Sequence, residues 1–282
     1  MSDKSTLIRE AAKKLLDEGK VDLVIGFENG TIPSRSSPCF IRKAADTERL
    51  VWNAHCENDL AKYLPGRKEK IGIVAKGCDS RAIVGLIQEK QIDREKLFII
   101  GVPCEGVVDR ETGEISETCK TCVHPNPVIF DVLIGDRVKE GDKLTHFSSV
   151  KEFAKKDSGE RWQYITDQLS KCIRCYGCRQ ACPFCYCREC FVDSTKPQWI
   201  GKTIDATDTQ FFHLVRAMHL AGRCVSCGAC ERACPMGIDL RVLNKKLEEE
   251  VTEQFGYEAG LTIESIPPMT TFRPDDREEF IK

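Results

Sequence analysis

The 282-residue sequence predicts two domains, an α/β N-terminal domain with a partly parallel sheet and a mostly α-helical domain after it. Three observations support this prediction. Short apolar runs alternate with segments of helical period up to about residue 145. Beyond about residue 160 the strand signals fade. Eleven of the 17 cysteines then fall between residues 172 and 234, which is far too dense for ordinary core packing.

The first elements follow from short local patterns. Residues 5–18 are expected to form an amphipathic helix that ends at Gly19, because their apolar side chains recur at helical spacing. These apolar residues are Leu7, Ile8, Ala11, Ala12, Leu15 and Leu16. The apolar run VDLVIGF, at 21–27, predicts a buried strand.

The clearest unit of the first half covers residues 70–106. It predicts a strand at 71–75, a helix at 79–90 and a strand at 97–102, which is the order of a βαβ crossover. The two strands should therefore be parallel, with a right-handed connection. The run PVIFDVLIGDRVKEGDKL, at 127–144, indicates one more strand and a turn.

Helices are expected to dominate the second half. Residues 207–222 predict a helix that begins with a capping-box pattern at Thr207 and Gln210 and ends at Gly222. Residues 239–255 predict another helix, whose apolar residues lie one turn apart and should share one face. These residues are Leu243, Leu247, Val251 and Phe255.

Shifts in composition place the domain boundaries. Residues 1–145 form the predicted α/β domain, and the polar residues 146–165 form a linker or a lead-in helix. Residues 166–256 form the helical domain. Residues 257–282 are Pro-rich and extended, which predicts a tail that docks on a partner, with a frayed terminus as the alternative.

The overall composition limits the function. A net charge of −2 leaves no electrostatic footprint for nucleic acid. No apolar run approaches the roughly 18–20 residues that a membrane span needs, and the charged start lacks the apolar core of a secretory signal. We therefore expect a cytoplasmic protein. In that reducing compartment, clustered cysteines bind metal more often than they form disulfides.

Two copies of one twelve-residue frame carry the strongest chemical signal, CIRCYGCRQACP at 172–183 and CVSCGACERACP at 224–235. The spacing C-x2-C-x2-C-x3-C-P is the bacterial ferredoxin run, in which the fourth cysteine ligates the other cluster. Two crossed [4Fe–4S] clusters are therefore predicted. The first takes Cys172, Cys175, Cys178 and Cys234, and the second takes Cys224, Cys227, Cys230 and Cys182. Structural zinc and free thiols are the alternatives, but zinc needs neither the third cysteine nor the proline.

Three more thiols and five arginines lie near these frames. The thiols are Cys185, Cys187 and Cys190. They could bind an extra metal, replace Cys182 as a ligand or line the seam between the domains, or they could simply be buried small side chains. Positive charge beside a thiolate-ligated cluster favours its reduced form. Each single arginine is nevertheless interpreted more simply as a solvated helix charge. The five are Arg174, Arg179, Arg216, Arg223 and Arg232.

Six cysteines remain in the α/β domain, and two of them directly follow strands. Cys78 and Cys104 come after adjacent parallel strands, where open sheets bind their ligands. The helix N-terminus at Cys78 should also favour its thiolate. Cys119 and Cys122, in CKTCVHP, are expected to join them. The four thiols predict a third [4Fe–4S] cluster, with Cys56 as a substitute ligand, and zinc or unliganded thiols are the alternatives.

The first domain resembles the beta subunits of deazaflavin-coenzyme-reducing hydrogenases and formate dehydrogenases over about residues 20–135. The resemblance lies in VDLVIGF, NAHC, KGCDSRAIVGLIQ, IIGVPCEG and CKTC, in this order. In that family the domain carries an iron–sulfur cluster and FAD and exchanges electrons with the deazaflavin. The resemblance implies the same candidate ligands, Cys56, Cys78, Cys104, Cys119 and Cys122. The family's glycine-rich flavin segment has no G-x-G-x-x-G counterpart in this chain.

The second domain resembles the α-helical two-cluster ferredoxin domains of succinate dehydrogenase iron–sulfur subunits and heterodisulfide reductase small subunits. The resemblance covers about residues 160–255. It rests on the long segment between the two frames, in which a helix is expected. It implies an α-helical domain that holds two [4Fe–4S] clusters close together.

The predicted function is electron transfer within an anaerobic oxidoreductase complex. The resemblance implies a formate dehydrogenase or hydrogenase catalytic subunit as one partner and a heterodisulfide-reductase-type flavoprotein as the other. The alternative is an FAD-containing beta subunit that itself reduces or oxidises a deazaflavin or nicotinamide coenzyme. A cluster-based sensor and thiol–disulfide chemistry in the first domain are further alternatives, although no DNA-binding motif or basic patch favours the sensor.

Overall fold

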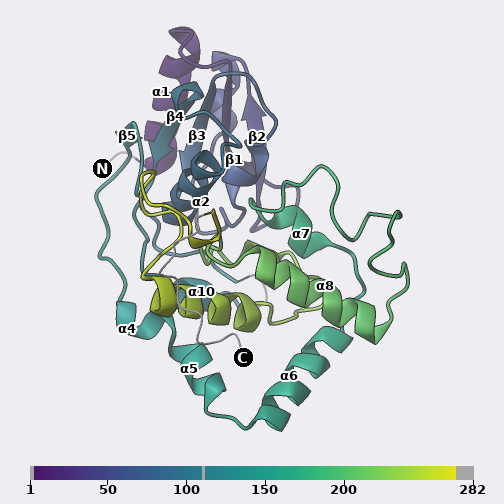
Figure 1. Cartoon of the computed structure of the whole chain (residues 1–282). Helices are drawn as coiled ribbons and strands as arrows, with labels where there is room; N and C mark the ends of the chain where they lie inside the picture. The colour runs from purple at the N-terminus through teal and green to yellow at the C-terminus, as the bar shows by residue number, and fades with distance from the viewer. Residues whose placement is uncertain (1–2, 110–111, 271–282) are drawn as a thin grey trace.

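The computed structural model describes residues 3–109 and 112–270 and places a sheet above a group of helices (Figure 1). Five strands form the sheet in the order β2-β1-β3-β4-β5. Their bounds are β1 Leu23–Asn29, β2 Ser36–Ile41, β3 Ile71–Ala75, β4 Leu97–Gly101 and β5 Val132–Leu133. All neighbouring pairs are parallel except β1 and β2. The predicted fold class, a partly parallel α/β domain followed by a helical region, is confirmed.

The α-helices fall mainly in the second half of the described chain. They are α1 Lys4–Asp17, α2 Gly77–Gln88, α3 Glu117–Lys120, α4 Lys143–His146, α5 Ser148–Ala154, α6 Ser158–Ser170, α7 Gly177–Ala181, α8 Ala206–His219, α9 Ala229–Arg232 and α10 Arg241–Phe255. Short 3-10 helices lie at Ala44–Arg49, Leu60–Tyr63, Arg94–Lys96 and Pro268–Thr270. Among the described residues, no helix has the length and apolarity that crossing a bilayer requires.

The predicted βαβ unit is confirmed in strands β3 and β4 with helix α2 between them. Ile71 pairs with Leu97 and Ala75 with Gly101, both in the parallel sense. Every residue of β3 is buried, which explains its continuous apolar sequence. The carboxyl ends of β3 and β4 therefore open at the same edge of the sheet, and this edge faces the helical region (Figure 1).

Strand β2 has no clear sequence signal. It begins among serines and contains Pro38, which is opposite Phe27 on β1. Proline cannot donate a ladder hydrogen bond, so this strand is restricted to the edge of the sheet. Its pairing with β1 is a long-range choice that local periodicity does not reveal.

Two details of the predicted helices are wrong. Helix α8 is capped by Asp205, whose carboxylate accepts from the backbone N–H groups of Thr207 and Asp208, so Thr207 is not the cap. Helix α10 buries a mainly polar face instead of the predicted leucine face, and Phe255 is 57% exposed. The buried side chains of α10 are Asn244, Lys245, Glu248, Glu249 and Val251.

Polar contacts explain the unexpected face of α10. Glu248 accepts from the ring of His146, at 2.9 Å, and also contacts the hydroxyl of Ser226. Lys245 lies 3.2 Å from the same hydroxyl. His146 belongs to α4, at the start of the segment interpreted as a linker, so the buried charges fasten that segment to the helical domain. Buried charges of this kind are tolerated because they are paired.

The described part of the C-terminal tail, residues 257–270, packs against the chain's own α2 (Figure 1). The guanidinium of Arg81 donates twice to the carbonyl of Ala259, at 2.7 and 3.0 Å. The amide of Gln88 donates to the carbonyls of Thr262 and Ser265. Docking on a partner therefore stays a prediction, and residues 271–282 lie outside the described residues.

Gly85 is a point of close approach between α2 and the segment that carries Phe184. A Cβ added there would come 2.7 Å from the ring of Phe184, so the ring fills the space that a side chain would need. We expect Gly85→Ala to lower the free energy of unfolding by about 1–3 kcal/mol, as overpacking does. Urea unfolding measures this effect.

A second substitution controls for a general effect of alanine at this position. Phe184→Leu removes the two ring atoms nearest to Gly85. In a double-mutant cycle, Gly85→Ala should therefore cost about 1 kcal/mol less in the Phe184→Leu background than in the original chain. Equal costs in both backgrounds would contradict the steric explanation.

Candidate iron–sulfur site

The two cysteine frames fold into loops with the same backbone pattern. The second residue after each first cysteine has a positive φ, 51° at Arg174 and 53° at Ser226. The pattern recurs two residues later, with 59° at Tyr176 and 69° at Gly228. A non-glycine residue in this region costs on the order of 1–3 kcal/mol and persists where its surroundings require it. The shared strain indicates that both loops are shaped for the same ligand.

Each loop leads into one short helix, α7 after the first and α9 after the second. The two segments lie very close, because a Cβ on Gly177 would come 2.9 Å from the carbonyl oxygen of Ala233. Ala233 directly precedes Cys234 in the sequence. This packing lets the end of each frame reach the other loop.

The first group of thiols joins one frame to the last cysteine of the other. Burial raises the pKa of Cys178 to about 11; Arg216 acts in the opposite direction, and the nearby thiols of Cys230, Cys172 and Cys234 contribute to the rise. Burial also raises the pKa of Cys172, with Cys234 and Cys175 as neighbouring thiols. Cys234 therefore lies with the three cysteines of the first frame, as the crossed prediction requires.

The second group has the reciprocal arrangement. Burial raises the pKa of Cys224 to about 12, with contributions from Cys230 and Cys182. Burial also raises the pKa values of Cys227 and Cys230, and Cys182 again adds to both shifts. The fourth cysteine of the first frame thus lies with the second frame. The ligand assignment itself stays a prediction.

Hydrogen-bond donors point at several of these sulfur atoms. The backbone N–H of Arg174 donates to Cys172 Sγ at 3.3 Å, and His213 Nε2 lies 3.3 Å from the same sulfur. Burial lowers the pKa of His213 to about 4, so its ring is neutral at pH 7. The amide of Asn244 lies 3.7 Å from Cys230 Sγ. Such donors stabilise ligating thiolates and help to set cluster potentials.

These residues fit two [4Fe–4S] clusters. Eight cysteines gather in two groups of four, of which only Cys175 is exposed, in loops that direct N–H groups toward sulfur. In a cubane cluster each thiolate binds a different iron, so its four ligands need not converge as tightly as those of one zinc ion. Within residues 3–109 and 112–270, no three His, Cys, Asp or Glu side chains are gathered closely enough for a single metal ion.

The cysteines of the first domain also converge, at the edge of the sheet that faces the helices. Cys78, Cys104, Cys119 and Cys122 all line one cavity of about 370 Å³. Cys78 follows β3 and Cys104 follows β4, as expected for ligands at the carboxyl ends of parallel strands. The backbone N–H of Gly106 donates to Cys104 Sγ at 3.4 Å, and that of Val107 donates to Cys119 Sγ at 3.5 Å. The four cysteines thus line one cavity, and their role as cluster ligands stays a prediction.

Cys56 does not line this cavity. It is buried beside Asn53, whose backbone N–H donates to Cys56 Sγ at 3.4 Å. Its role as a substitute ligand stays a prediction that the geometry does not favour. The signal against it is local, since Cys56 follows no strand of the sheet.

The expected effect of the α2 terminus on Cys78 is wrong. Burial raises the pKa of the Cys78 thiol well above its usual value, and the Asp79 carboxylate raises it further. Asp79 accepts from the backbone N–H of Lys76 at 2.8 Å and pairs with the Lys76 ammonium at 2.9 Å. Burial and the neighbouring carboxylate together outweigh the helix terminus, so a ligand must displace the Cys78 proton.

Lys76 supplies a buried positive charge beside the cavity. Its side chain is 2% exposed. Burial lowers the pKa of Lys76, but Asp79 and the thiols of Cys78 and Cys104 raise it more, so the ammonium stays protonated. A cation in this position would compensate the negative charge of a thiolate-ligated cluster.

The cavity connects the two domains. Besides the four cysteines, its lining includes Ser226, Cys227 and Arg232 from the second frame and α9. Cys78 is one of the groups that raise the pKa of Cys227, although burial and Asp59 contribute more. Arg232 donates to the carbonyls of Glu57, at 2.7 Å, and Cys227, at 2.9 Å. The first-domain thiols and the second frame therefore share one wall.

The three extra cysteines, Cys185, Cys187 and Cys190, line a separate cavity of about 380 Å³. Cys185 lies beside Cys182 and Arg216, and contact with Cys182 is the main factor that lowers the pKa of Cys185 to about 7. Cys187 is exposed. This placement brings Cys185 to the second group of thiols, and its role as an extra ligand stays a prediction.

The interpretation of the frame arginines as solvated charges is wrong for two of them. Arg174 and Arg216 are both buried, because their guanidinium groups serve backbone carbonyls near the loops. Arg174 donates to the carbonyl of Gly201 at 2.8 Å. Arg216 donates to the carbonyl of Cys178 at 3.1 Å. Sequence spacing alone does not distinguish these two from exposed helix arginines.

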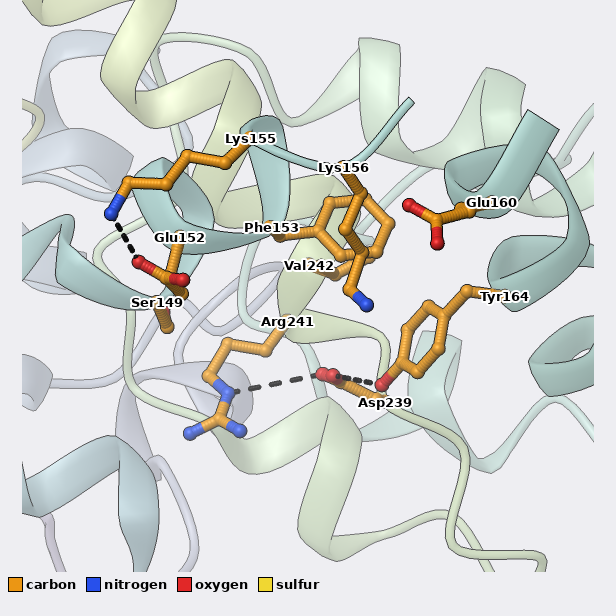
Figure 2. A pocket seen from close by; sticks show the side chains of 10 residues that line it. All are labelled: Ser149, Glu152, Phe153, Lys155, Lys156, Glu160, Tyr164, Asp239, Arg241 and Val242. Atoms are coloured by element: carbon orange, nitrogen blue, oxygen red, sulfur yellow. Dashed lines mark hydrogen bonds and ion pairs between the residues drawn. The ribbon is translucent and has the colours of Figure 1, made fainter. Parts of the chain in front are cut away.

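A further cavity, of about 610 Å³, lies between α5, α6 and the start of α10. Figure 2 shows Tyr164 pointing at Asp239, with Arg241 on the other side of the same carboxylate. Tyr164 donates to Asp239 at 2.9 Å, and burial with this contact raises the pKa of Tyr164 to about 12. No cysteine lines this cavity, so it stands apart from the thiol groups.

Comparison with known families agrees with the prediction of a two-cluster domain in the second half of the chain. A family model described as a 4Fe-4S dicluster domain matches residues 168–238. This range contains both cysteine frames. The match implies two [4Fe–4S] clusters.

Curated relatives match nearly the whole chain. The F420-dependent formate dehydrogenase subunit beta of Methanocaldococcus jannaschii is 24% identical over 355 residues, covering 91% of this chain and 92% of the relative. The F420-dependent formate dehydrogenase 1 subunit beta of Methanococcus maripaludis is 25% identical over 356 residues, covering 91% of each. Since this chain has 282 residues, both relatives contain segments without a counterpart here.

A solved structure matches more weakly. A chain of the F420-reducing [NiFe] hydrogenase complex from Methanosarcina barkeri is 18% identical, with 38% of each chain covered and a TM-score of 0.31. A TM-score this low establishes no common fold. The whole-length sequence matches and the dicluster match therefore carry the comparison. The chain is similar over nearly its whole length to beta subunits of F420-dependent formate dehydrogenases, and its residues 168–238 match a 4Fe-4S dicluster domain.

Proposed function

We propose that this chain is an iron–sulfur electron-transfer subunit of an anaerobic oxidoreductase complex, with three [4Fe–4S] clusters. The observation that carries the proposal is the order of the three thiol groups in space. Cys178, of the first group, neighbours Cys230, of the second. Cys227, also of the second group, lines the first-domain cavity with Cys78. The groups thus form a continuous series from the helical domain to the sheet.

The residues around these thiols fit such a role. When bound, a [4Fe–4S] cluster accepts and releases one electron at a time, which requires no acid, base or nucleophile. The loops hold their sulfur atoms through backbone N–H donors and strained residues, and all of these cysteines except Cys175 are at least partly buried. Charged side chains such as Lys76 compensate negative charge inside the domain. A rigid, partly dry set of sites is what repeated electron transfer needs.

Two partners are proposed, and the names of the relatives support the first of them. We propose that a formate dehydrogenase or hydrogenase catalytic subunit exchanges electrons with this chain on one side. We propose a flavoprotein of the heterodisulfide-reductase type on the other side. The names of the relatives, which are beta subunits of F420-dependent formate dehydrogenases, support the first partner. The protein would act in the cytoplasm.

The second candidate is a beta subunit that binds FAD and itself reduces or oxidises a deazaflavin or nicotinamide coenzyme. Its support is the extent of the match, which covers 91% of the chain. A flavin spectrum separates the two candidates.

Iron content of the anaerobically purified chain tests the third cluster. We expect about 12 irons per chain, four for each thiol group, and about 8 after Cys104→Ala, because the first-domain group then lacks one ligand. Acid-labile sulfide should fall in parallel. Cys39→Ala is the matched control, since Cys39 is buried in the same domain but does not line the cavity.

Three results would count against this proposal. About 8 irons in the unmodified chain would limit the protein to the two ferredoxin frames. An unchanged iron content in Cys104→Ala would exclude the first-domain thiols as ligands. Bound flavin in the purified chain would favour the coenzyme-reducing beta subunit over the carrier.

A further inference from the structure

Arg216 is buried among thiols of both predicted clusters. It lies on α8, its residue is 4% exposed, and its guanidinium donates to the carbonyl of Cys178 in the first frame. Burial lowers the pKa of Arg216, but the thiols of Cys230, Cys182, Cys178 and Cys185 raise it well above its usual range. The side chain is therefore close to sulfur atoms from both thiol groups at once.

The neighbouring thiols would become counter-charges of Arg216 once they are deprotonated as cluster ligands. Its Nε is buried and has no hydrogen-bond partner among the described residues. Other arginines nearby pair with carboxylates instead, Arg179 with Asp193 at 2.8 Å and Arg223 with Glu89. An uncompensated buried guanidinium is strongly unfavourable. The structure thus contains a cation in need of negative charge, located between two sites that each gather four thiols.

Negative charge is what two bound clusters would supply. A [4Fe–4S] cluster with four thiolate ligands is negatively charged, and each added electron increases that charge. A fixed cation nearby favours the more negative state, and a dry environment strengthens this effect. Two clusters that share one cation also repel one another less when both are reduced.

We propose that Arg216 is the common counter-charge of the two ferredoxin-type sites and that it favours the reduced form of both. The inference rests on the proposed function only in requiring two bound clusters. It makes Arg216 a positioning and charge-compensating residue that acts through the clusters. Its effect should appear in both reduction potentials together, which distinguishes it from a contact that serves one loop.

An anaerobic redox titration followed by electron paramagnetic resonance tests this role in the full chain. Arg216→Met keeps most of the side-chain volume and removes the charge. We expect it to shift the reduction equilibrium of both clusters at least tenfold toward the oxidised form, a fall of ~59 mV in each potential. Arg216→Lys keeps the charge and should restore most of both potentials.

Arg188→Gln is the matched control. Arg188 lines the same cavity as Arg216 and Cys185, but its side chain is exposed to solvent. It removes an equal charge and should leave both potentials unchanged, because water screens it. Iron and sulfide are measured first in every variant. Arg216→Met could lose its clusters, and the test then rests on Arg216→Lys. Reduction potentials of Arg216→Lys close to those of the original chain support the proposal.

Several outcomes would overturn the inference. Unchanged potentials in Arg216→Met, a shift of one cluster alone, or a fall in Arg216→Lys as large as that in Arg216→Met would each do so. Failure of the proposed function looks different. In that case the unmodified chain would lack the iron and the two reducible clusters, whatever residue occupies position 216.

Discussion

Replacing Cys234 with alanine should remove the cluster held by Cys172, Cys175 and Cys178, and spare the cluster of the frame in which Cys234 itself lies. The physical reason is the crossed packing of the two loops, which places Cys234 beside Cys172 and Cys178. Loss of one ligand of four leaves one iron exposed, and about four irons per chain should be lost. Iron and sulfide analysis of the anaerobic protein measures this loss.

The spectrum of the remaining reduced cluster identifies which site was lost. Cys234→Ala should match Cys178→Ala, its partner across the frames, and differ from Cys230→Ala. The reciprocal variant, Cys182→Ala, should match Cys230→Ala. Cys187→Ala is the control, because that thiol is exposed and belongs to neither group. A spectrum of Cys234→Ala that matches Cys230→Ala would show that each frame ligates its own cluster.

Replacing Arg81 with methionine should destabilise the junction between the domains by about 3–5 kcal/mol, the usual cost of breaking a buried charged contact. Arg81 lies on α2 and is almost fully buried. It donates to the carbonyls of Ala259, in the tail, and Val225, between two cysteines of the second frame. It also lies 3.5 Å from the carboxylate of Glu258. The substitution leaves all of these acceptors without their shared partner.

Urea unfolding of the loaded chain, followed by the visible absorbance of its clusters, measures the effect. Absorbance in Arg81→Met should be lost at a clearly lower urea concentration than in the unmodified chain. Arg81→Lys should recover only part of the loss, because an ammonium cannot reproduce the fork of the guanidinium. Gln88→Ala removes uncharged hydrogen bonds to the same tail from a more exposed position and should cost about 1 kcal/mol. Equal midpoints for Arg81→Met and Gln88→Ala would refute the junction role.

The local sequence was sufficient for the parallel unit and for the cysteine frames. Strands β3 and β4 read as short apolar runs because both their faces are buried, and the helix between them has its own period. The two frames encode their loops directly, since the spacing of the cysteines and the strained residues between them recur in both. These features depend on neighbours only a few residues away.

Other features depend on contacts between distant residues and carry no local signal. The apolar spacing of α10 predicts a leucine face, but the helix turns its charged side inward because His146 and Ser226 offer partners. Strand β2 forms because it pairs with β1 at the edge of the sheet, where Pro38 can be accommodated. The Cys78 thiol has a raised pKa because burial and Asp79 outweigh the helix terminus. In each case, interactions with distant residues outweigh the preference of the local sequence.

The sequence by itself determined the fold class, the two frames and the set of cysteines that the first domain brings together. Only the tertiary structure decided that Cys78 and Cys227 line one cavity, that Cys56 stays outside it, and that Arg216 is buried among the thiols of both frames. The cysteine spacing specifies each loop because a short segment has few ways to place three closely spaced thiols around one cluster. Charge, burial and domain contact come from the side chains that folding brings together, so no single stretch of sequence contains them.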